Sequence, residues 1–220
     1  MEFELYCRAE SGNCYKVALM LSLCNLSWRP RFVDFFNDAS RAEFRAKVSG
    51  MGELPVLKAN NLTLSQSGVI LTYLSEATGL FGGKTDEERR EILRWILFDN
   101  HRFTPSYATL RFVRGLRGLP ESAVTEWLRG QAIIALEIVE ERLKDRPFVV
   151  GDDLTIADIS MCAYQFYHEE TGIDRSQYPH IGAWLDRIAS YPGWAHPYEL
   201  MPRALASAAR EGAAGRDDEP

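Results

Sequence analysis

The sequence contains few cysteines, and those it has form no close pair. Cys7, Cys14, Cys24 and Cys162 include no C-x-x-C motif and show no metal-ligand spacing. Zinc sites and dithiol redox centres depend on such spacing, and a disulfide scaffold needs a denser set of cysteines. We therefore expect neither a disulfide framework nor a metal.

Blocks of like charge and long apolar runs are also missing. With 25 basic and 31 acidic residues the formal net charge is -6, and the charges are interspersed. Nucleic-acid surfaces need clustered lysine and arginine, so no nucleic acid is expected as a partner. No run approaches the roughly 20 apolar residues of a bilayer-spanning helix, and Met1 leads into an acidic segment rather than a signal segment. These absences predict a cytoplasmic protein with no membrane partner.

The first third of the chain alternates between strand-like and helix-like periodicity. Strands are expected over residues 3–6, 31–35, 56–58 and 62–64, and helices near 13–24, 40–48 and 67–78. Asn60-Asn61 predicts a hairpin turn between the last two strands. This β-α-β-α-β-β-α order is typical of a thioredoxin-like domain, which we place at residues 1–79.

The rest of the chain has helical periodicity alone. Gly79, Gly82 and Gly83 interrupt the pattern and predict a linker, after which Thr85 begins a capping-box sequence. Helices are expected from residue 85, over 121–144, from 155 and near 181–190. The fold class is therefore α+β, with an all-α C-terminal helical domain at residues 85–206. The Ala-, Gly- and charge-rich residues 207–220 predict a disordered tail.

Two of these helices carry more specific predictions. The apolar pattern over 121–144 predicts these inward-facing residues: Trp127, Leu128, Ile134, Leu136, Ile138, Val139 and Leu143. In the next helix Thr155 and Asp158 are spaced as a capping box, with the hydroxyl on the Asp158 amide and the carboxylate reaching back to Thr155. We interpret this pair as structural.

The segment Gly52-Glu53-Leu54-Pro55-Val56-Leu57 and the later Gln66-Ser67 are the most informative part of the chain. Proline cannot donate to a sheet ladder, so Pro55 belongs at the first residue of a strand or at an edge. Ser67 precedes apolar residues at helical spacing and so lies where a helix begins. The first N–H groups of a helix have no internal partners and bind anions, including carboxylates. The pattern indicates a carboxylate pocket beside an exposed strand edge.

A second helix start lies upstream, in Ser11-Gly12-Asn13-Cys14-Tyr15-Lys16. Gly12 relaxes the backbone, Asn13 can cap the helix, and Ser11 faces the amides of the first turn. The two helix starts are expected to converge on one ligand.

Together these motifs resemble the glutathione S-transferase family, in particular its serine-using, bacterial-style members. The matching segments are Ser11–Val17, Glu53–Leu57, Gln66-Ser67 and Leu154–Ile159, in the family's order and across most of the chain. The resemblance implies glutathione as co-substrate, a cis peptide bond before Pro55, and a two-fold homodimer whose cleft borrows from the partner subunit.

The resemblance assigns the catalytic role to Ser11, as a hydrogen-bond donor to the glutathione thiolate. Ser11 is not expected to act as a nucleophile, because no histidine or lysine is placed to deprotonate it. Three alternatives stay open. Ser11 can be only a helix cap, Tyr6 can be the donor, or Cys14 can exchange thiols with glutathione, although a cysteine there is more often a small core residue.

The resemblance also implies the glutathione-binding residues. Ser67 and Gln66 would hold the γ-glutamyl end, and the Leu54-Pro55 backbone would pair with the cysteinyl part as an added strand does. Gln66 is neutral, so another acid is needed for the ligand's ammonium, and Asp99, from the same subunit or from its partner, is the candidate. Arg41 or Lys47 would meet the glycyl carboxylate.

The second substrate is expected to be a small hydrophobic electrophile bound between the domains. Phe103, Tyr107 and Phe112, with Arg111 among them, are the candidate pocket residues. The function predicted is conjugation of glutathione to that electrophile. The alternatives are a thiol transferase or disulfide reductase that uses Cys14, and a non-enzymatic glutathione-binding or interaction protein of the same fold.

Overall fold

The computed structural model describes residues 2–203, and its first part is a four-stranded mixed sheet. The elements in order are β1 (Phe3–Cys7), α1 (Gly12–Leu23), β2 (Trp28–Phe32), α2 (Asp38–Lys47), β3 (Val56–Ala59), β4 (Leu62–Ser65) and α3 (Ser67–Thr78). The strand order is β2-β1-β3-β4, with β1 parallel to β2 and the other pairs antiparallel. This confirms the thioredoxin-like layout predicted from the sequence.

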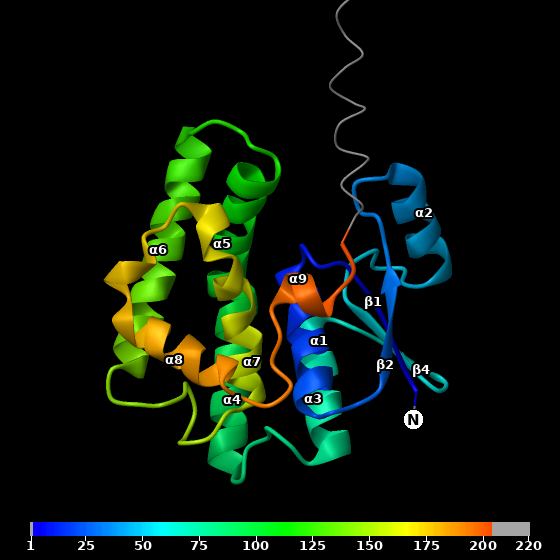
Figure 1. Cartoon of the computed structure of the whole chain (residues 1–220), viewed down its shortest axis with the longest axis horizontal. Coiled ribbons are helices and arrows are strands. Elements are labelled where there is room, and N and C mark those ends of the chain that lie inside the picture. The colour runs from blue at the N-terminus through cyan, green and yellow to red at the C-terminus, as the bar shows by residue number, and fades with distance from the viewer. Residues whose placement is uncertain (1, 204–220) are drawn as a thin grey trace, which may run out of the picture.

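Helices cover both faces of the sheet (Figure 1). Leu5 and Leu57 point toward α1 and α3 and belong to the main core, whereas Tyr6 and Val56 point the other way and pack with Phe44 of α2. This division follows from the two-residue period of a strand, in which neighbours face opposite sides. The helices α1 and α3 therefore lie between the sheet and the second domain.

The second strand begins earlier than predicted. The sequence indicated residues 31–35, but β2 spans Trp28–Phe32 and pairs Pro30 with Leu5. The pairing can run through Pro30 because β2 is an edge strand, where a residue without an N–H group is tolerated. The expected continuation is broken by a turn, in which Asp34 accepts a hydrogen bond from the Phe36 N–H at 3.0 Å.

All the described elements after the linker are helical. They are α4 (Asp86–Phe98), η1 (Asp99–Phe103), α5 (Thr104–Arg111), η2 (Phe112–Leu116), α6 (Ala123–Leu143), α7 (Ile156–Cys162), η3 (Ala163–Thr171), η4 (Arg175–Gln177), α8 (Pro179–Ala189) and α9 (Pro197–Leu200). The segments η1 and η2 are wider π-type turns that continue the helix on either side of α5. The predicted tail at 207–220 lies outside the described residues.

Helix α6 buries a narrower stripe than predicted. Leu128, Leu136, Val139 and Leu143 are buried as expected, but Trp127 is 64% exposed, and Ile134 and Ile138 are also exposed. The buried stripe is completed by two alanines, at positions 132 and 135, which let the neighbouring helices approach closely.

Helix α7 begins with the capping box predicted for Thr155 and Asp158. The Asp158 carboxylate accepts hydrogen bonds from the Val149 N–H at 2.8 Å, the Thr155 N–H at 3.0 Å and the Trp184 indole N–H at 3.0 Å. These contacts fix the start of α7, which packs against α1 and α3 of the first domain. One continuous hydrophobic core therefore joins the two domains.

Among the residues that the structure describes, no helix is both long and apolar enough to cross a bilayer.

Candidate functional site

Ser11 caps helix α1, as its place in the sequence predicted. Its Oγ accepts a hydrogen bond from the Cys14 N–H at 3.3 Å. Asn13 does not cap, and its buried Oδ1 has no hydrogen-bond partner. A methyl group at Gly12 would lie 2.6 Å from the Tyr164 ring, so close packing requires glycine here. Because a hydroxyl both donates and accepts, Ser11 still has a proton to offer a ligand.

The second helix start carries an unusual backbone conformation at Gln66. Its φ of 68° lies in the left-handed region that non-glycine residues rarely adopt. Its side-chain amide donates to Glu53 Oε2 at 2.8 Å, and Ser67 opens α3 with only 5% of its surface exposed. The Leu54-Pro55 peptide bond is cis, as the resemblance implied. Strained positions such as Gln66 concentrate at ligand sites.

A cavity of about 310 Å³ connects the two helix starts, and we call it the strand-edge cavity. Its lining consists of Arg8, Ser11, Asn13, Phe35, Glu53, Leu54, Pro55, Gln66, Ser67 and Asn100. Five predicted residues, Ser11, Leu54, Pro55, Gln66 and Ser67, therefore meet in one place. The two helix starts therefore border the same cavity, and their binding of one ligand stays a prediction.

The basic residues predicted for the glycyl carboxylate are not in this cavity. Arg41 pairs with Asp38 at 2.6 Å on the surface of α2, and its side chain lines a neighbouring cavity instead. Lys47 pairs with Glu43 at 2.9 Å. The basic residue that the cavity does hold is Arg8, which the motif analysis missed. Its place at the carboxyl end of β1, just before the first helix start, was the available signal.

Tyr6, the rival donor, lies on the wrong face of the sheet. Its ring packs 6.0 Å from that of Phe44, and the Lys58 ammonium lies 5.2 Å from its centre. Both neighbours belong to the α2 side, opposite the helix starts. Tyr6 therefore cannot reach a ligand held at Ser11.

Asp99 is not available for an ammonium group. It is fully buried and takes hydrogen bonds from the Lys16 ammonium at 2.6 Å, the Thr104 hydroxyl at 2.6 Å and the Ser160 hydroxyl at 2.5 Å. The prediction that it contacts the ligand is wrong, because helix packing turns it inward toward α1. The acid that lines the strand-edge cavity is Glu53.

Cys14 is poorly suited to thiol exchange. It is fully buried, and burial raises the pKa of its thiol to about 11, against a smaller opposing effect of the Ser11 hydrogen bond. At neutral pH it stays a thiol, whereas the thiolate is the nucleophile. Its side chain lines neither the strand-edge cavity nor the neighbouring cavity that Arg41 lines. These observations favour the alternative interpretation of Cys14 as a small core residue.

A second cavity, of about 470 Å³, adjoins the first, and we call it the interdomain cavity. Its lining consists of Arg8, Glu10, Ser11, Phe35, Phe36, Asp38, Arg41, Ala108, Arg111, Phe112, Leu116, Arg117 and Tyr164. Arg8, Ser11 and Phe35 belong to both cavities. A thiol held at Ser11 would therefore face the interdomain cavity.

The predicted pocket residues divide between this cavity and the core. Phe112 lines the cavity, but Phe103 and Tyr107 are 1% and 2% exposed, and their rings stack with centroids 6.3 Å apart inside the helical domain. Residues four apart lie on one face of a helix, so Phe103 and Tyr107 turn inward together. The face that reaches the cavity carries Ala108, Arg111 and Phe112.

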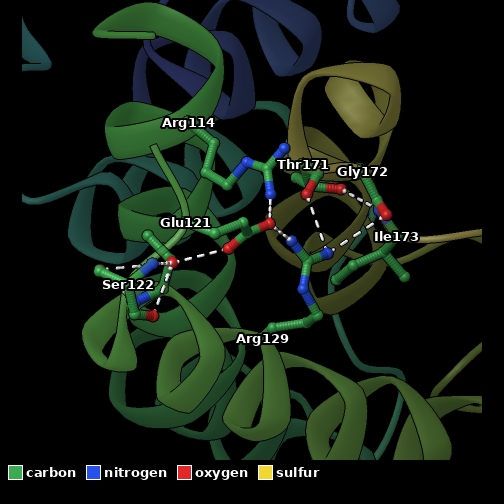
Figure 2. A network of polar contacts seen from close by, with 8 residues as sticks. Arg114, Glu121, Ser122, Arg129, Thr171, Gly172 and Ile173 are labelled. Atoms are coloured by element: carbon green, nitrogen blue, oxygen red, sulfur yellow. Dashed lines mark hydrogen bonds and ion pairs between the residues drawn. The ribbon is translucent and has the colours of Figure 1, made fainter. Parts of the chain in front are cut away.

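A network of polar contacts joins η2 to α6 and to the end of η3 (Figure 2). Arg114 of η2 and Arg129 of α6 both point at the Glu121 carboxylate, and Arg129 lies 2.8 Å from it. Arg129 also donates to the carbonyl oxygens of Thr171 and Gly172 at 3.3 and 3.2 Å. Phe112 and Leu116 of η2 line the interdomain cavity, so this network fixes the position of that part of the cavity wall.

Fold and site together define a class of protein. It has a thioredoxin-like domain with a cavity between two helix starts, and a helical domain that lines a second cavity beside it. Comparison with protein families agrees. Residues 5–83 match the glutathione S-transferase N-terminal domain, and residues 120–192 match the C-terminal domain. The chain belongs to the glutathione S-transferase family.

Individual relatives support the same assignment. The crystal structure of a glutathione S-transferase from Pseudomonas fluorescens Pf-5 is 33% identical, covers 89% of this chain and 98% of that one, and has a TM-score of 0.83. Disulfide-bond oxidoreductase YfcG from Escherichia coli K12 is 26% identical over 84% of this chain and 89% of its own length. Maleylacetoacetate isomerase from Rhizobium meliloti is 28% identical over 91% of this chain and 99% of its own length. The relatives thus share the fold but differ in the reactions their names describe.

Proposed function

We propose that this protein is a serine-type glutathione transferase, which joins the sulfur of glutathione to a small electrophile. The observation that carries the proposal is the strand-edge cavity, where Ser11 lies together with Leu54, Gln66 and Ser67. Membership of the family supports the choice of ligand. The proposal includes a homodimer and a cytoplasmic location, as expected from the sequence.

Glutathione would lie along the strand edge. Ser67 offers its hydroxyl and the first N–H groups of α3 to the γ-glutamyl carboxylate. Glu53, next to the Gln66 amide, offers a carboxylate to the adjacent ammonium. The Leu54 backbone pairs with the cysteinyl part in the manner of an added strand. This order leaves the thiol at the Ser11 end of the cavity.

Ser11 would donate its hydroxyl proton to the sulfur, which favours the thiolate over the thiol. The thiol loses its proton to solvent, and the sulfur lone pair then forms a bond to the electrophilic carbon. A leaving group departs with its bonding pair, or an activated double bond takes up a proton at the neighbouring carbon. Each unit by which the site lowers the thiol pKa corresponds to about 1.4 kcal/mol of preferential thiolate binding.

Ser11→Ala tests this proposal, with the ultraviolet absorbance of the bound thiolate titrated against pH. We expect the pKa of bound glutathione to rise and the rate near neutral pH to fall, while glutathione affinity changes little because the backbone contacts remain. Ser122→Ala is the matched control, because Ser122 caps α6 through an equally long hydrogen bond of 3.3 Å to the Thr125 N–H. Equal bound-thiol pKa values in Ser11→Ala and wild type would reject Ser11 as the activating donor.

A second candidate function is disulfide exchange by bound glutathione. The observation that favours it is the similarity to a relative named as a disulfide-bond oxidoreductase. The glutathione thiolate would attack one sulfur of the substrate disulfide and release the other as a thiolate, with no protein cysteine involved. Cys14→Ala would leave such an activity intact. If exchange instead went through Cys14, the same variant would lose the activity.

A further inference from the structure

The interdomain cavity is more basic than a site for a neutral hydrophobic compound needs to be. Its lining includes four arginines, Arg8, Arg41, Arg111 and Arg117, against the acids Glu10 and Asp38. The whole chain has a formal net charge of -6. The basic character is therefore local to the cavity.

Two of the four arginines are already engaged. Arg111 donates to the Glu170 carboxylate at 2.9 Å, the Glu10 carbonyl at 2.6 Å and the Tyr198 hydroxyl at 3.0 Å. Arg41 pairs with Asp38 at 2.6 Å. The charges of these two side chains are therefore already paired within the protein, in the wall of the cavity.

Arg8 is different, because part of its guanidinium has no partner. It is only 5% exposed, its Nε pairs with Glu10 at 3.0 Å, and its buried Nη2 makes no hydrogen bond. The guanidinium lies 4.2 Å from the centre of the Phe36 ring. An unsatisfied buried donor costs about 1–3 kcal/mol or more when charged, and it is normally paired in the functional state.

Arg117 supplies a second available cation. It is exposed at the end of η2, lies 6.0 Å from the centre of the Phe112 ring, and has no ion pair within residues 2–203. Phe36 and Phe112 thus each place an apolar ring surface beside an available guanidinium. Arginine binds carboxylates strongly because its donors match the geometry of the two oxygens.

We propose that the second substrate is an anionic electrophile, whose carboxylate is bound by Arg8 and Arg117 while its apolar body packs on Phe36 and Phe112. This inference rests on the proposed transferase function and narrows the small hydrophobic electrophile expected from the sequence to one that carries a carboxylate. An apolar group would cover Arg8 without satisfying its Nη2, and a neutral acceptor would pair with the guanidinium more weakly than a carboxylate does. A carboxylate in the cavity pairs with that atom and leaves the reactive carbon near the Ser11 end.

The test compares 4-chloro-3,5-dinitrobenzoate with its methyl ester. In both, the glutathione sulfur bonds to the ring carbon and chloride leaves with its bonding pair. The remote group differs in charge, and the ester also carries an extra methyl group and activates the ring more strongly. Rates are divided by the uncatalysed rate with free glutathione. We expect the wild-type kcat/KM, corrected in this way, to favour the acid about tenfold, as for one charge-assisted hydrogen bond.

Arg117→Gln and Arg8→Gln are each expected to abolish most of this preference, by raising KM for the acid without changing KM for glutathione. Arg117 is exposed, so its variant gives a result even where the buried Arg8 variant does not fold. Arg146→Gln removes an exposed arginine after α6 and is the matched control, with the preference retained.

The outcomes separate this inference from the function on which it rests. Equal use of acid and ester overturns the anionic-substrate inference and leaves the transferase function standing. A raised KM for glutathione in Arg8→Gln assigns Arg8 to glutathione and overturns its role here. Absence of conjugation with both compounds, together with no glutathione binding, overturns the proposed function itself.

Discussion

Ser11 illustrates how one hydroxyl can serve a helix and a ligand at the same time. From the sequence, capping and thiol activation are alternatives for this residue. In the structure its oxygen accepts from the Cys14 N–H, and this contact uses a lone pair rather than the proton. The two roles are therefore compatible, and the helix start orients the group that the proposed chemistry needs.

Ser67→Ala should weaken glutathione binding. The variant removes one hydrogen bond to a charged carboxylate, worth about 1.5–3 kcal/mol, so the dissociation constant should rise about 10- to 150-fold. Isothermal titration calorimetry gives the constant directly. Ser65→Ala is the control, because Ser65 lies two residues earlier and does not line the cavity. An unchanged dissociation constant for Ser67→Ala would show that Gln66-Ser67 only begins a helix and does not bind glutathione.

Residues that act through local backbone chemistry could be predicted from the sequence. Ser11, Pro55 and Ser67 each occupy the first position of a helix or the approach to a strand, and short motifs specify such places. Asn100 could not be predicted in this way, because it reaches the strand-edge cavity only when segments far apart in the chain pack together. Asp99 was misplaced for the same reason, since its partners Lys16 and Ser160 are distant in sequence. Arg8 was missed although it lies three residues before Ser11.

At the scale of elements, existence and order were predictable but rotation was not. A helix from residue 85 and one over 121–144 were expected, yet Phe103 and Tyr107 turn inward while Trp127 turns outward. One residue corresponds to about 100° around a helix, so a small error in the assumed face exchanges pocket and core. The π-type turns at η1 and η2 add to this uncertainty, because they change the residues per turn.

Asp158→Ala should destabilise the helical domain strongly. The variant leaves the Val149 N–H, the Thr155 N–H and the Trp184 indole N–H buried without their acceptor. Each unsatisfied donor costs about 1–3 kcal/mol, so we expect a loss of about 3 kcal/mol or more in the free energy of unfolding. Urea denaturation measures this loss, and the exposed Asp152→Ala should lie within about 0.5 kcal/mol of wild type. A similarly small effect at Asp158 would contradict its structural role.

At the scale of the whole molecule, α3 and α4 present an apolar surface to the outside. Val69, Leu93 and Leu97 are 52%, 56% and 59% exposed, and Gly68 packs against Ile96 between the two helices. Exposed apolar patches mark interaction surfaces, and this patch begins two residues after Ser67. We propose it as the homodimer interface that the resemblance implies.

The double variant Leu93→Glu, Leu97→Glu should be monomeric in light scattering, because two carboxylates cannot be buried at an interface without partners. Glutathione affinity and activity should fall with it, since α3 begins in the cavity. Trp127→Glu introduces charge at an equally exposed apolar site on α6 and should remain a dimer. A fully active monomer would show that activity does not depend on a dimer formed through this surface.

The ion pair between Lys16 of α1 and Asp99 of η1 limits how the two domains of this protein can be exchanged with those of others. Each charge comes from a different domain, and neither has any exposed surface. Breaking a buried pair from one side costs about 3–5 kcal/mol, comparable with much of a domain's stability. A fusion of this first domain with the helical domain of another protein should therefore need an acid at the position of Asp99 to keep the stability of the parent. The stability of each domain therefore depends on a charge that the other domain supplies.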